Sequence, residues 1–430
     1  MTREFIDFIK THESEDTARL LLSAARYPSI DMAAAVQQIE GRRTAREKWP
    51  SLLECDDFLY PPRLNREQAS SEATARHKAA ICYRRFDKHG QHGENHSRPL
   101  RIVDLTGGMG IDTFALAGWR SGEPSEVEVD YVERDEELCS LAQSNAKTLG
   151  LSNVHVHCGD SLEWLRQQDS RFDLIFVDPA RRDIHGRKVA AFVDCTPDIL
   201  AHREMLFSKG RKIVIKASPM IDIDMACHQL GHVYEVHIVG VGGECKEVMF
   251  IGTSDAVSTE LEITCWNILN NLNTPNNQSN QSNQSNQSSP ISPTMVFTRA
   301  EEATCVPRYC TALGRYLYIP DATLMKAGAF NLIAVRYDIA KLARNTHLYT
   351  SDERVGEFPG RVLESVQEMK CTRKDAQRWI PDGKAHVLTR NYPTAAADLQ
   401  RQLGLKEGGD LFVVATTVGR EKKIFLCKQA

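Results

Sequence analysis

The chain has 430 residues, of which 42% are hydrophobic and 26% are charged, and its formal net charge is −4. This length predicts two or three domains, and the hydrophobic fraction excludes a chain that is disordered throughout. No apolar run approaches the roughly 20 residues of a membrane span, which excludes an integral membrane protein. The N-terminal segment MTREFIDFIKTHESEDTARL lacks the apolar core of a signal peptide, so we expect a cytoplasmic protein.

Cysteine spacing and charge distribution give two further expectations. Twelve cysteines are scattered without CxxC spacing, and we expect them to be thiols. Residues 336–430 carry a net charge of +5, which leaves −9 for residues 1–335. A basic C-terminal segment on an acidic body is compatible with contact to RNA, although so modest a charge also has purely structural explanations.

The N-terminal segment is predicted to be mainly helical. Asp31–Glu40 combines strong helix formers with apolar residues at helical spacing, and a second helix is predicted over 65–86. His89, His92 and His96 follow, at a spacing that would place three metal ligands on one face of a helix. Because this stretch is polar and contains glycine, we expect a loop without a metal site.

From Leu100 the chain alternates between short apolar runs and helical segments, which predicts a parallel sheet covered on both faces. The predicted strands are 101–105, 127–133, 154–158, 173–178 and 212–217. Two further strand-like runs within 233–253 flank Gly242 and Gly243, which predicts an antiparallel hairpin at the end of the sheet.

The composition and the pattern of predicted elements change in the C-terminal third of the chain. Four copies of Asn-Gln-Ser over 277–288 cannot form a core and predict a flexible insertion. A smaller mixed region begins after Ser292, and we expect one or two small α+β modules there. The predicted strands are 316–320, 386–393, 410–418 and 423–427, and the predicted helices are 361–369 and 394–405.

The strongest functional signal is the turn VDLTGGMGID over 103–112, which follows an apolar strand. Its candidate ligand-binding residues are Asp104, Thr106, Gly107, Gly108 and Gly110. Glycines let the backbone pass close to a ligand and tolerate positive φ. Many nucleotide-binding folds contain such a turn, so a simple packing turn is the alternative on this motif alone.

Acidic residues follow three more predicted strands. Glu133 can accept hydrogen bonds from both hydroxyls of a ribose, and Asp160 can accept one from an adenine amino group. Asp178 and Pro179 come directly after the fourth strand. Because ligands bind beyond the carboxyl ends of the strands in open α/β sheets, we expect these residues to share one site.

The order of these motifs resembles the class I S-adenosylmethionine (SAM)-dependent methyltransferases. Their Rossmann-like sheet is parallel and ends in an antiparallel hairpin, and the resemblance covers residues 98–255. It implies SAM as the cofactor, no metal, and a cofactor site built from the glycine turn, Glu133 and Asp160. A nicotinamide enzyme is the main competitor, but it needs neither Asp178-Pro179 nor the hairpin. Thr106 stands where many members have a first glycine.

Asp178, Pro179 and Arg181 are the predicted catalytic residues. The segment Asp178-Pro-Ala-Arg181 resembles the Asp/Asn-Pro-Pro-aromatic motif of methylases of exocyclic amino groups, in which an aromatic ring stacks on the base. Arg181 replaces that ring and could stack through its guanidinium or contact a phosphate. Methylation of pyrimidine carbon 5 needs a cysteine nucleophile, and the nearest cysteine, Cys195, lies in a different segment.

Two more stretches are candidates for the acceptor side of the site. The basic stretch 181–188 is expected either to contact phosphate or to form a solvated loop. The hairpin turn over 242–246 is expected to overhang the same edge, with Glu244 and Lys246 in substrate contact or in structural roles.

A fuller resemblance is to a bacterial group of these methyltransferases that carries ferredoxin-like and THUMP-like modules. The shared segments are 38–43, 48–50 and 68–72, the motifs DLTGGMG and DPARR, and GGECKE ending at Glu247. The resemblance implies a helical region (1–98), a methyltransferase domain (99–256), a ferredoxin-like module (257–335) with a disordered insertion at 273–292, and a THUMP-like domain (336–430).

The implied activity follows from those modules. Because THUMP domains elsewhere bind RNA, the resemblance implies an RNA substrate, either rRNA or tRNA. The likeness of Asp178-Pro179 to the amino-methylase motif implies a base amino group as the acceptor. Two alternatives remain open: a catalytically inactive RNA-binding protein that retains the SAM fold, and a small-molecule methyltransferase.

Overall fold

The computed structural model of the protein describes residues 1–83, 98–120, 127–181, 192–255, 260–268 and 292–430. The chain forms two compact units. The first contains Met1–Val236, Glu247–Thr259 and Ile268–Ser288, and the second contains His237–Lys246, Glu260–Asn267 and Ser289–Ala430. The three clustered histidines, the Asn-Gln-Ser repeat and the basic stretch from Arg182 to Lys188 lie outside the described residues.

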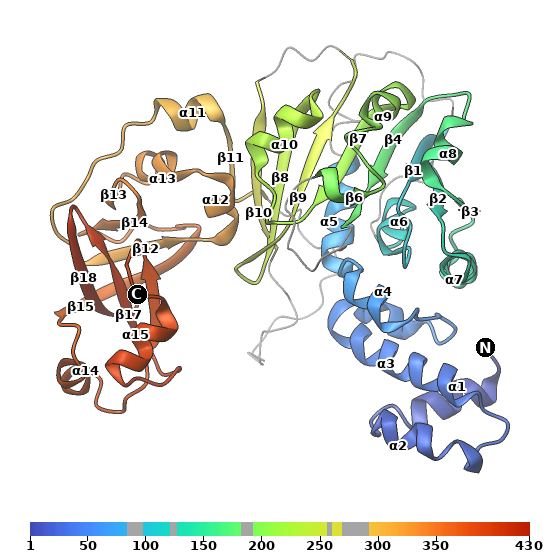
Figure 1. The fold of residues 1–430 in the computed structure, drawn as a ribbon, viewed down its shortest axis with the longest axis horizontal. Coiled ribbons are helices and arrows are strands. Elements are labelled where there is room, and N and C mark those ends of the chain that lie inside the picture. Colours follow the sequence, from blue (N-terminus) through green and yellow to red (C-terminus); the bar gives the residue numbers. More distant parts are fainter. Residues whose placement is uncertain (84–97, 121–126, 182–191, 256–259, 269–291) are drawn as a thin grey trace, which may run out of the picture. The chain divides into compact units, whose positions relative to one another are not determined.

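The N-terminal region is helical as far as Tyr83 (Figure 1). Its elements are α1 (Arg3–Thr11), α2 (Thr17–Leu22), η1 (Ala24–Arg26), α3 (Met32–Lys48), η2 (Pro50–Glu54), α4 (Arg63–Gln68) and α5 (Glu72–Tyr83). The predicted helix over 31–40 is confirmed by α3, which Asp31 caps by accepting a hydrogen bond from the Ala34 N–H. The helix predicted over 65–86 is interrupted, because Ala69 is extended and ends α4.

Hydrogen bonds fix the point where α5 begins. Lys48 Nζ donates to three carbonyls at the end of α4. The Trp49 indole donates to the Ser70 carbonyl at 2.7 Å, and the Glu72 carboxylate accepts from the backbone and hydroxyl of Ser51. These bonds join two of the segments that the bacterial group shares, and they hold α5 in place.

The first sheet has nine strands in the order β11-β10-β8-β9-β7-β4-β1-β2-β3. They are β1 (Leu100–Asp104), β2 (Val127–Glu133), β3 (Val154–Cys158), β4 (Phe172–Val177), β7 (Gly210–Ala217), β8 (Val233–Val241), β9 (Glu244–Gly252), β10 (Glu262–Ile268) and β11 (Met295–Thr298). Five strands, β3-β2-β1-β4-β7, pair in parallel, and β9 is antiparallel to β7. The predicted Rossmann-like sheet with an antiparallel hairpin is confirmed.

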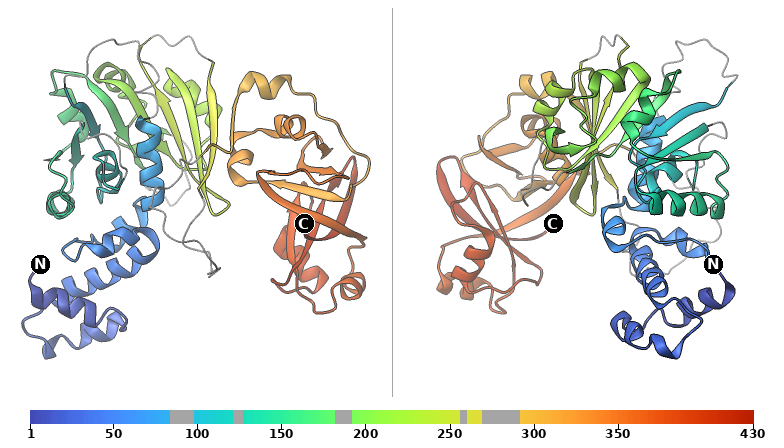
Figure 2. Two further views of the ribbon diagram at one scale, coloured as in Figure 1. Left: turned by 180° about the vertical axis from the view of Figure 1, so that it is seen from behind. Right: turned by 45° about the vertical axis from the view of Figure 1, so that its right-hand side comes forward.

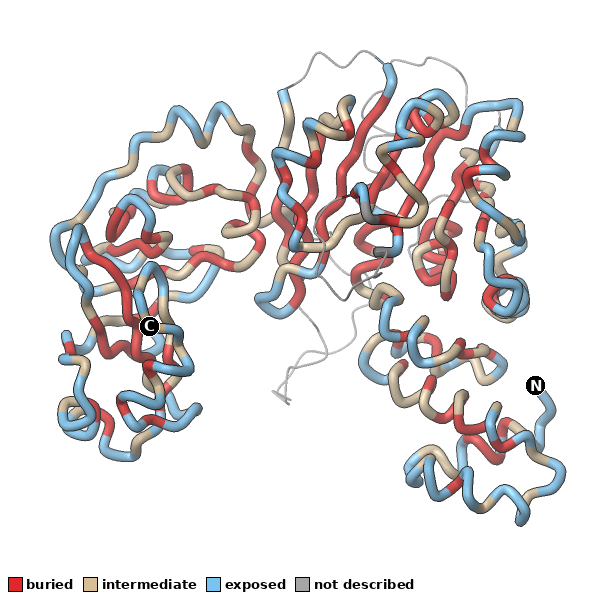
Figure 3. Tube along the Cα trace, in the orientation of Figure 1, coloured by how far each residue is buried: buried red, intermediate tan, exposed pale blue. Residues whose placement is uncertain are grey.

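Helices cover both faces of the parallel strands. They are α6 (Ile111–Leu116), α7 (Glu136–Thr148), α8 (Ser161–Arg166), α9 (Arg203–Lys209) and α10 (Ile223–Leu230). A short 3-10 helix, η3 (Phe192–Asp194), precedes α9 in the chain. Helices α5 and α6 lie on one face, and α9 and α10 lie on the other (Figure 2). The central strand β4 is buried at every residue, whereas β3 at the edge of the sheet is only partly buried (Figure 3). Coverage of both faces is the usual condition of a parallel sheet.

The hairpin of β8 and β9 turns at two glycines. Gly242 has φ +60° and Gly243 has φ +85°. Positive φ at both central residues gives a turn whose twist matches that of the flanking strands, and glycine adopts it without strain.

The second sheet has seven strands in the order β13-β14-β12-β15-β18-β17-β16. They are β12 (Tyr316–Pro320), β13 (Ala340–Ala343), β14 (Thr346–Ser351), β15 (Gly360–Met369), β16 (His386–Arg390), β17 (Leu411–Val418) and β18 (Glu421–Gln429). The accompanying helices are α11 (Arg299–Thr304), α12 (Ala322–Ala327), α13 (Phe330–Arg336), α14 (Arg373–Trp379) and α15 (Ala396–Leu403). Strands β12, β16, β17 and β18 and helix α15 confirm the predicted elements.

The helix predicted over 361–369 is wrong, because this segment forms β15. Its Leu, Glu, Gln and Met residues favour a helix locally. Antiparallel pairing with β12 on one side and β18 on the other overrides that preference, and Val362 and Val366 suit a strand. A second difference concerns 257–335: β10 and β11 lie in the first sheet, and the second sheet begins at Tyr316.

All twelve cysteines are present as thiols, as expected. Within the described ranges, no helix is both long and apolar enough to cross a membrane.

Candidate active site

The glycine turn between β1 and α6 leaves part of its backbone open. Gly108 has φ +53° and Gly110 has φ +87°, both in the left-handed region. A Cβ on Gly110 would lie 2.7 Å from the Phe114 ring, whereas a Cβ on Gly108 would meet only the Thr106 carbonyl oxygen, at 3.8 Å. Gly110 is therefore needed for packing, whereas the space beside Gly108 is open to a ligand.

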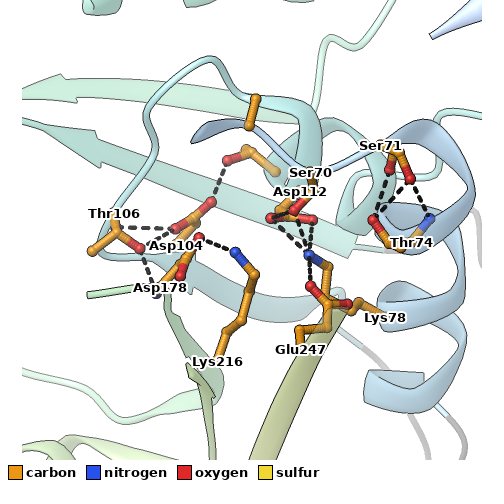
Figure 4. Close-up of polar contacts among 12 residues, drawn as sticks. Ser70, Ser71, Thr74, Lys78, Asp104, Thr106, Asp112, Asp178, Lys216 and Glu247 are labelled. Atoms are coloured by element: carbon orange, nitrogen blue, oxygen red, sulfur yellow. Dashed lines mark hydrogen bonds and ion pairs between the residues drawn. The ribbon is translucent and has the colours of Figure 1, made fainter. Parts of the chain in front are cut away.

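Asp104 lies beneath this turn and is 1% exposed. Its carboxyl accepts hydrogen bonds from the Thr106 N–H (3.0 Å), the Thr106 hydroxyl (3.3 Å) and the Thr113 hydroxyl (2.7 Å) (Figure 4). Burial raises the pKa of Asp104 to about 7, although these hydrogen bonds act against the increase. Through these hydrogen bonds the Asp104 side chain holds the turn in its conformation.

The raised pKa of Asp104 predicts a pH-dependent stability. Its pKa is higher in the folded protein than the usual 3.9 of an unfolded chain, so stabilisation is present at low pH and is lost as the pH rises towards 7. Relative to Asp104→Asn, the wild type should lose about 1.4 kcal/mol of unfolding free energy per pH unit between pH 5 and 7. Urea unfolding at both values tests this, and parallel pH curves for the two proteins would contradict it.

Glu133, the last residue of β2, touches the turn directly. Its Oε2 accepts a hydrogen bond from the Gly108 N–H at 3.0 Å, and its Oε1 accepts from the N–H groups of Arg134 and Asp135. An ionised carboxylate offers about four acceptor positions, so capacity remains for a further donor. Glu133 therefore lies beside Gly108 at the edge of the sheet and can accept a further hydrogen bond there.

Asp160 is held next to Glu133 through the backbone. The Gly159 N–H donates to the Glu133 carbonyl at 2.8 Å. Asp160 Oδ1 caps α8 by accepting from the N–H groups of Leu162 and Glu163. The side chain is exposed, and none of the described residues forms a hydrogen bond with Oδ2.

Thr106 connects the glycine turn to Asp178. Its hydroxyl oxygen accepts a hydrogen bond from the Asp178 N–H at 2.7 Å, which a glycine at position 106 could not do. Asp178 Oδ2 accepts from Lys216 Nζ at 2.5 Å, while no described residue bonds to Oδ1. The Asp178 side chain is 33% exposed, so Oδ1 remains available to a ligand.

The other two predicted catalytic residues follow Asp178 in the chain. Pro179 is buried. Arg181 lies in the short strand β5 (Ala180–Arg181), which is antiparallel to β6 (Cys195–Thr196) and pairs Arg181 with Cys195. The Arg181 side chain is outside the described part of the structure. In the hairpin turn, Lys246 donates to Glu244 at 2.7 Å.

Sequence reasoning missed a cluster of buried charges beside the site (Figure 4). Lys78 of α5 is 1% exposed, and its Nζ lies 2.9 Å from Asp112 Oδ1 and 3.1 Å from Glu247 Oε2. Lys78 also donates to the Ser70 hydroxyl, which in turn donates to Asp112. Ser70 and Glu247 belong to segments that the bacterial group shares, and this was the available signal.

Each acid of the cluster has a shifted pKa. Burial raises the pKa of Glu247, although Lys78 and Lys216 oppose the increase. Burial would also raise the pKa of Asp112, but the ammonium groups of Lys78 and Lys216 outweigh it, and the pKa is lowered.

The residues at this edge fit SAM. Glu133 and Asp160 are acidic acceptors of the kind that ribose hydroxyls and an adenine amino group require, and no side chain lies within 4 Å of a Cβ built on Gly108. Fold and site together define a class I SAM-dependent methyltransferase domain, with SAM as its cofactor.

Comparisons with known proteins agree with this class. Residues 96–222 match a family described as a methyltransferase domain, residues 316–359 a ferredoxin-like domain, and residues 360–429 a THUMP domain-like family. A crystal structure from Porphyromonas gingivalis W83, provisionally described as a methyltransferase, is similar over 99% of this chain and 98% of its own, with 28% identity and a TM-score of 0.80. The chain thus combines a methyltransferase domain with ferredoxin-like and THUMP-like domains.

Curated relatives are similar over shorter stretches. An Escherichia coli O157:H7 tRNA1(Val) (adenine(37)-N6)-methyltransferase is 36% identical over 80 residues, which cover 18% of this chain and 31% of that protein. An uncharacterised RNA methyltransferase of Thermosynechococcus vestitus is 32% identical over 101 residues, which cover 23% of this chain and 21% of the relative. The chain therefore spans less than a third of the length of either relative.

Proposed function

We propose that this protein transfers a methyl group from SAM to a base amino group in RNA, in the cytoplasm. The observation that carries the proposal is the Asp178 carboxylate, whose Oδ1 is accessible while the backbone N–H is bonded to the glycine turn. An RNA substrate is supported by the two RNA methyltransferases among the relatives and by the THUMP-like domain.

The proposed cofactor-binding residues are the seven of the sequence analysis, with different tasks. Glu133 and Asp160 bind the ribose and the adenine, and Gly107, Gly108 and Gly110 form the turn. Asp104 and Thr106 stabilise the turn. Asp104 is buried below it, and Thr106 connects it to the Asp178 N–H. When bound, SAM supplies an electrophilic methyl group on a positively charged sulfur.

The acceptor chemistry falls to Asp178, Pro179 and Arg181. An amino nitrogen that gains a methyl group must lose one proton. Asp178 Oδ1 can accept a hydrogen bond from that N–H, orient the nitrogen lone pair, and take the proton as the new N–C bond forms. The proton then passes to solvent, because the side chain is one-third exposed. Arg181 would stack on the base or contact a phosphate.

The structure makes carbon-5 chemistry a defined second candidate. Strand pairing brings Cys195 opposite Arg181, which is two residues beyond Pro179, although Cys195 lies in a separate segment of the sequence. Cys195 is only 8% exposed, which is unfavourable for a nucleophile. The amino-group assignment is therefore preferred.

Mass spectrometry of modified nucleosides tests the proposed function. RNA from cells without the gene should lack one base-N-methylated nucleoside, and wild-type protein should restore it. Loss of a 5-methylpyrimidine would support carbon-5 chemistry instead. Unchanged nucleosides in rRNA and tRNA would contradict an RNA substrate.

A further inference from the structure

Lys216 reaches the predicted acceptor residue from a neighbouring strand. It is the penultimate residue of β7, which pairs in parallel with β4, the strand that ends just before Asp178. Lys216 Nζ donates to Asp178 Oδ2, its only hydrogen-bond partner among the residues that the structure describes. The ammonium group of Lys216 points at Asp178 (Figure 4). The lysine side chain is 15% exposed, so it is largely shielded from water.

The charges around Lys216 come from several elements. Burial alone would lower its pKa, but the carboxylates of Asp178, Glu247 and Asp112 outweigh burial and raise it. Lys48 of α3 is the like charge that faces it. The ammonium group therefore stays charged across the pH range of an enzyme assay.

Asp178 is thus held from two sides. Thr106 fixes its backbone, and Lys216 occupies one carboxylate oxygen, which leaves the other for the acceptor. The charge of Asp178 contributes in turn to the raised pKa of Asp104, which lies beneath the turn. A single oxygen of defined direction suits in-line methyl transfer, which requires an aligned lone pair.

We propose that Lys216 is a positioning residue, which holds Oδ2 of the Asp178 carboxylate through a charge-assisted hydrogen bond and so directs the free Oδ1 toward the methyl acceptor. This inference rests on the proposed function of Asp178. In this role Lys216 does not contact the substrate. It also lies outside the Asp178-Pro-Ala-Arg181 segment that resembles the amino-methylase motif.

The test compares Lys216→Met, which removes the charge, with Lys216→Arg, which keeps it. Lys212→Met is the matched control, because Lys212 is buried on the same strand but bonds to the Cys82 carbonyl. In Lys216→Met we expect the acidic limb of the kcat/KM profile for RNA methylation to move to higher pH, because the positive charge that bonds to Asp178 is lost. We also expect kcat to fall while the SAM Kd changes little, and Lys216→Arg to recover most of both effects.

A merely structural role predicts something different. If Lys216→Met and Lys212→Met lose activity only in proportion to their folded fraction, with unshifted pH profiles, the inference is overturned. A second measurement does not need RNA. The ¹³C NMR signal of the Asp178 carboxyl carbon, assigned through Asp178→Asn, is followed as the pH is changed. Its midpoint should rise in Lys216→Met and not in Lys212→Met. An inactive wild type with that shift would contradict the proposed function alone, and an unshifted midpoint would contradict the role of Lys216.

Discussion

Replacing Asp178 with alanine is expected to lower kcat/KM for RNA methylation by about 10²- to 10⁴-fold, the range of a lost general base. The affinity for SAM should stay close to that of the wild type, because Glu133 and the glycine turn remain. Radiolabelled methyl transfer to RNA from cells that lack the gene measures the rate, and calorimetry measures the affinity. Equal methyl incorporation by wild type and Asp178→Ala would exclude a catalytic role for this carboxylate.

Two further variants sharpen that experiment. Asp178→Asn keeps an oxygen acceptor but cannot take a proton, so activity well above Asp178→Ala would assign orientation rather than proton removal to the side chain. Asp222→Ala is the matched control, because Asp222 only caps α10 by accepting from the Met225 N–H. This change should cost about 1 kcal/mol of stability and leave the rate per folded molecule unchanged.

Replacing Lys78 with methionine is expected to destabilise the first unit by about 3 to 5 kcal/mol. The change leaves Asp112 and Glu247 buried without the ammonium group that bonds to them, and Glu247 Oε1 already has no partner among the described groups. Equilibrium unfolding in urea, followed by circular dichroism, measures the loss.

The control for Lys78 is an exposed ion pair. Arg63 and Glu67 lie 2.7 Å apart, with side chains 79% and 57% exposed, so Arg63→Ala should leave the stability almost unchanged. Adding Glu247→Gln to Lys78→Met should recover part of the stability, because one uncompensated carboxylate is removed. A loss for Lys78→Met no larger than that for Arg63→Ala would refute the buried cluster.

The placement of the candidate acids at one edge of the sheet was predictable because its signals are local. Each acid follows an apolar run in the sequence, and parallel strands bring their carboxyl ends to one edge, so Glu133, Asp160 and Asp178 could be placed together. The antiparallel hairpin was equally predictable, because Gly242-Gly243 between two strand-like runs specifies its turn.

The contacts that set the chemistry were not predictable, because they join distant residues. Lys78 and Glu247 are 169 positions apart, and Thr106 meets Asp178 across 72 positions. The same limit explains β15: its helix-forming residues were visible, but its partners β12 and β18 were not. Local preference gave way to non-local strand pairing there.

Isothermal titration calorimetry of SAM with the full-length protein tests the central claim most directly. Wild type should bind SAM, and Glu133→Ala should bind it about 10- to 100-fold more weakly, since charge-assisted hydrogen bonds are lost. Glu128→Ala should bind as wild type does, because this glutamate lies on the same strand but pairs with His155. A folded wild type without measurable affinity, or equal affinities for wild type and Glu133→Ala, would contradict a cofactor site at this edge of the sheet.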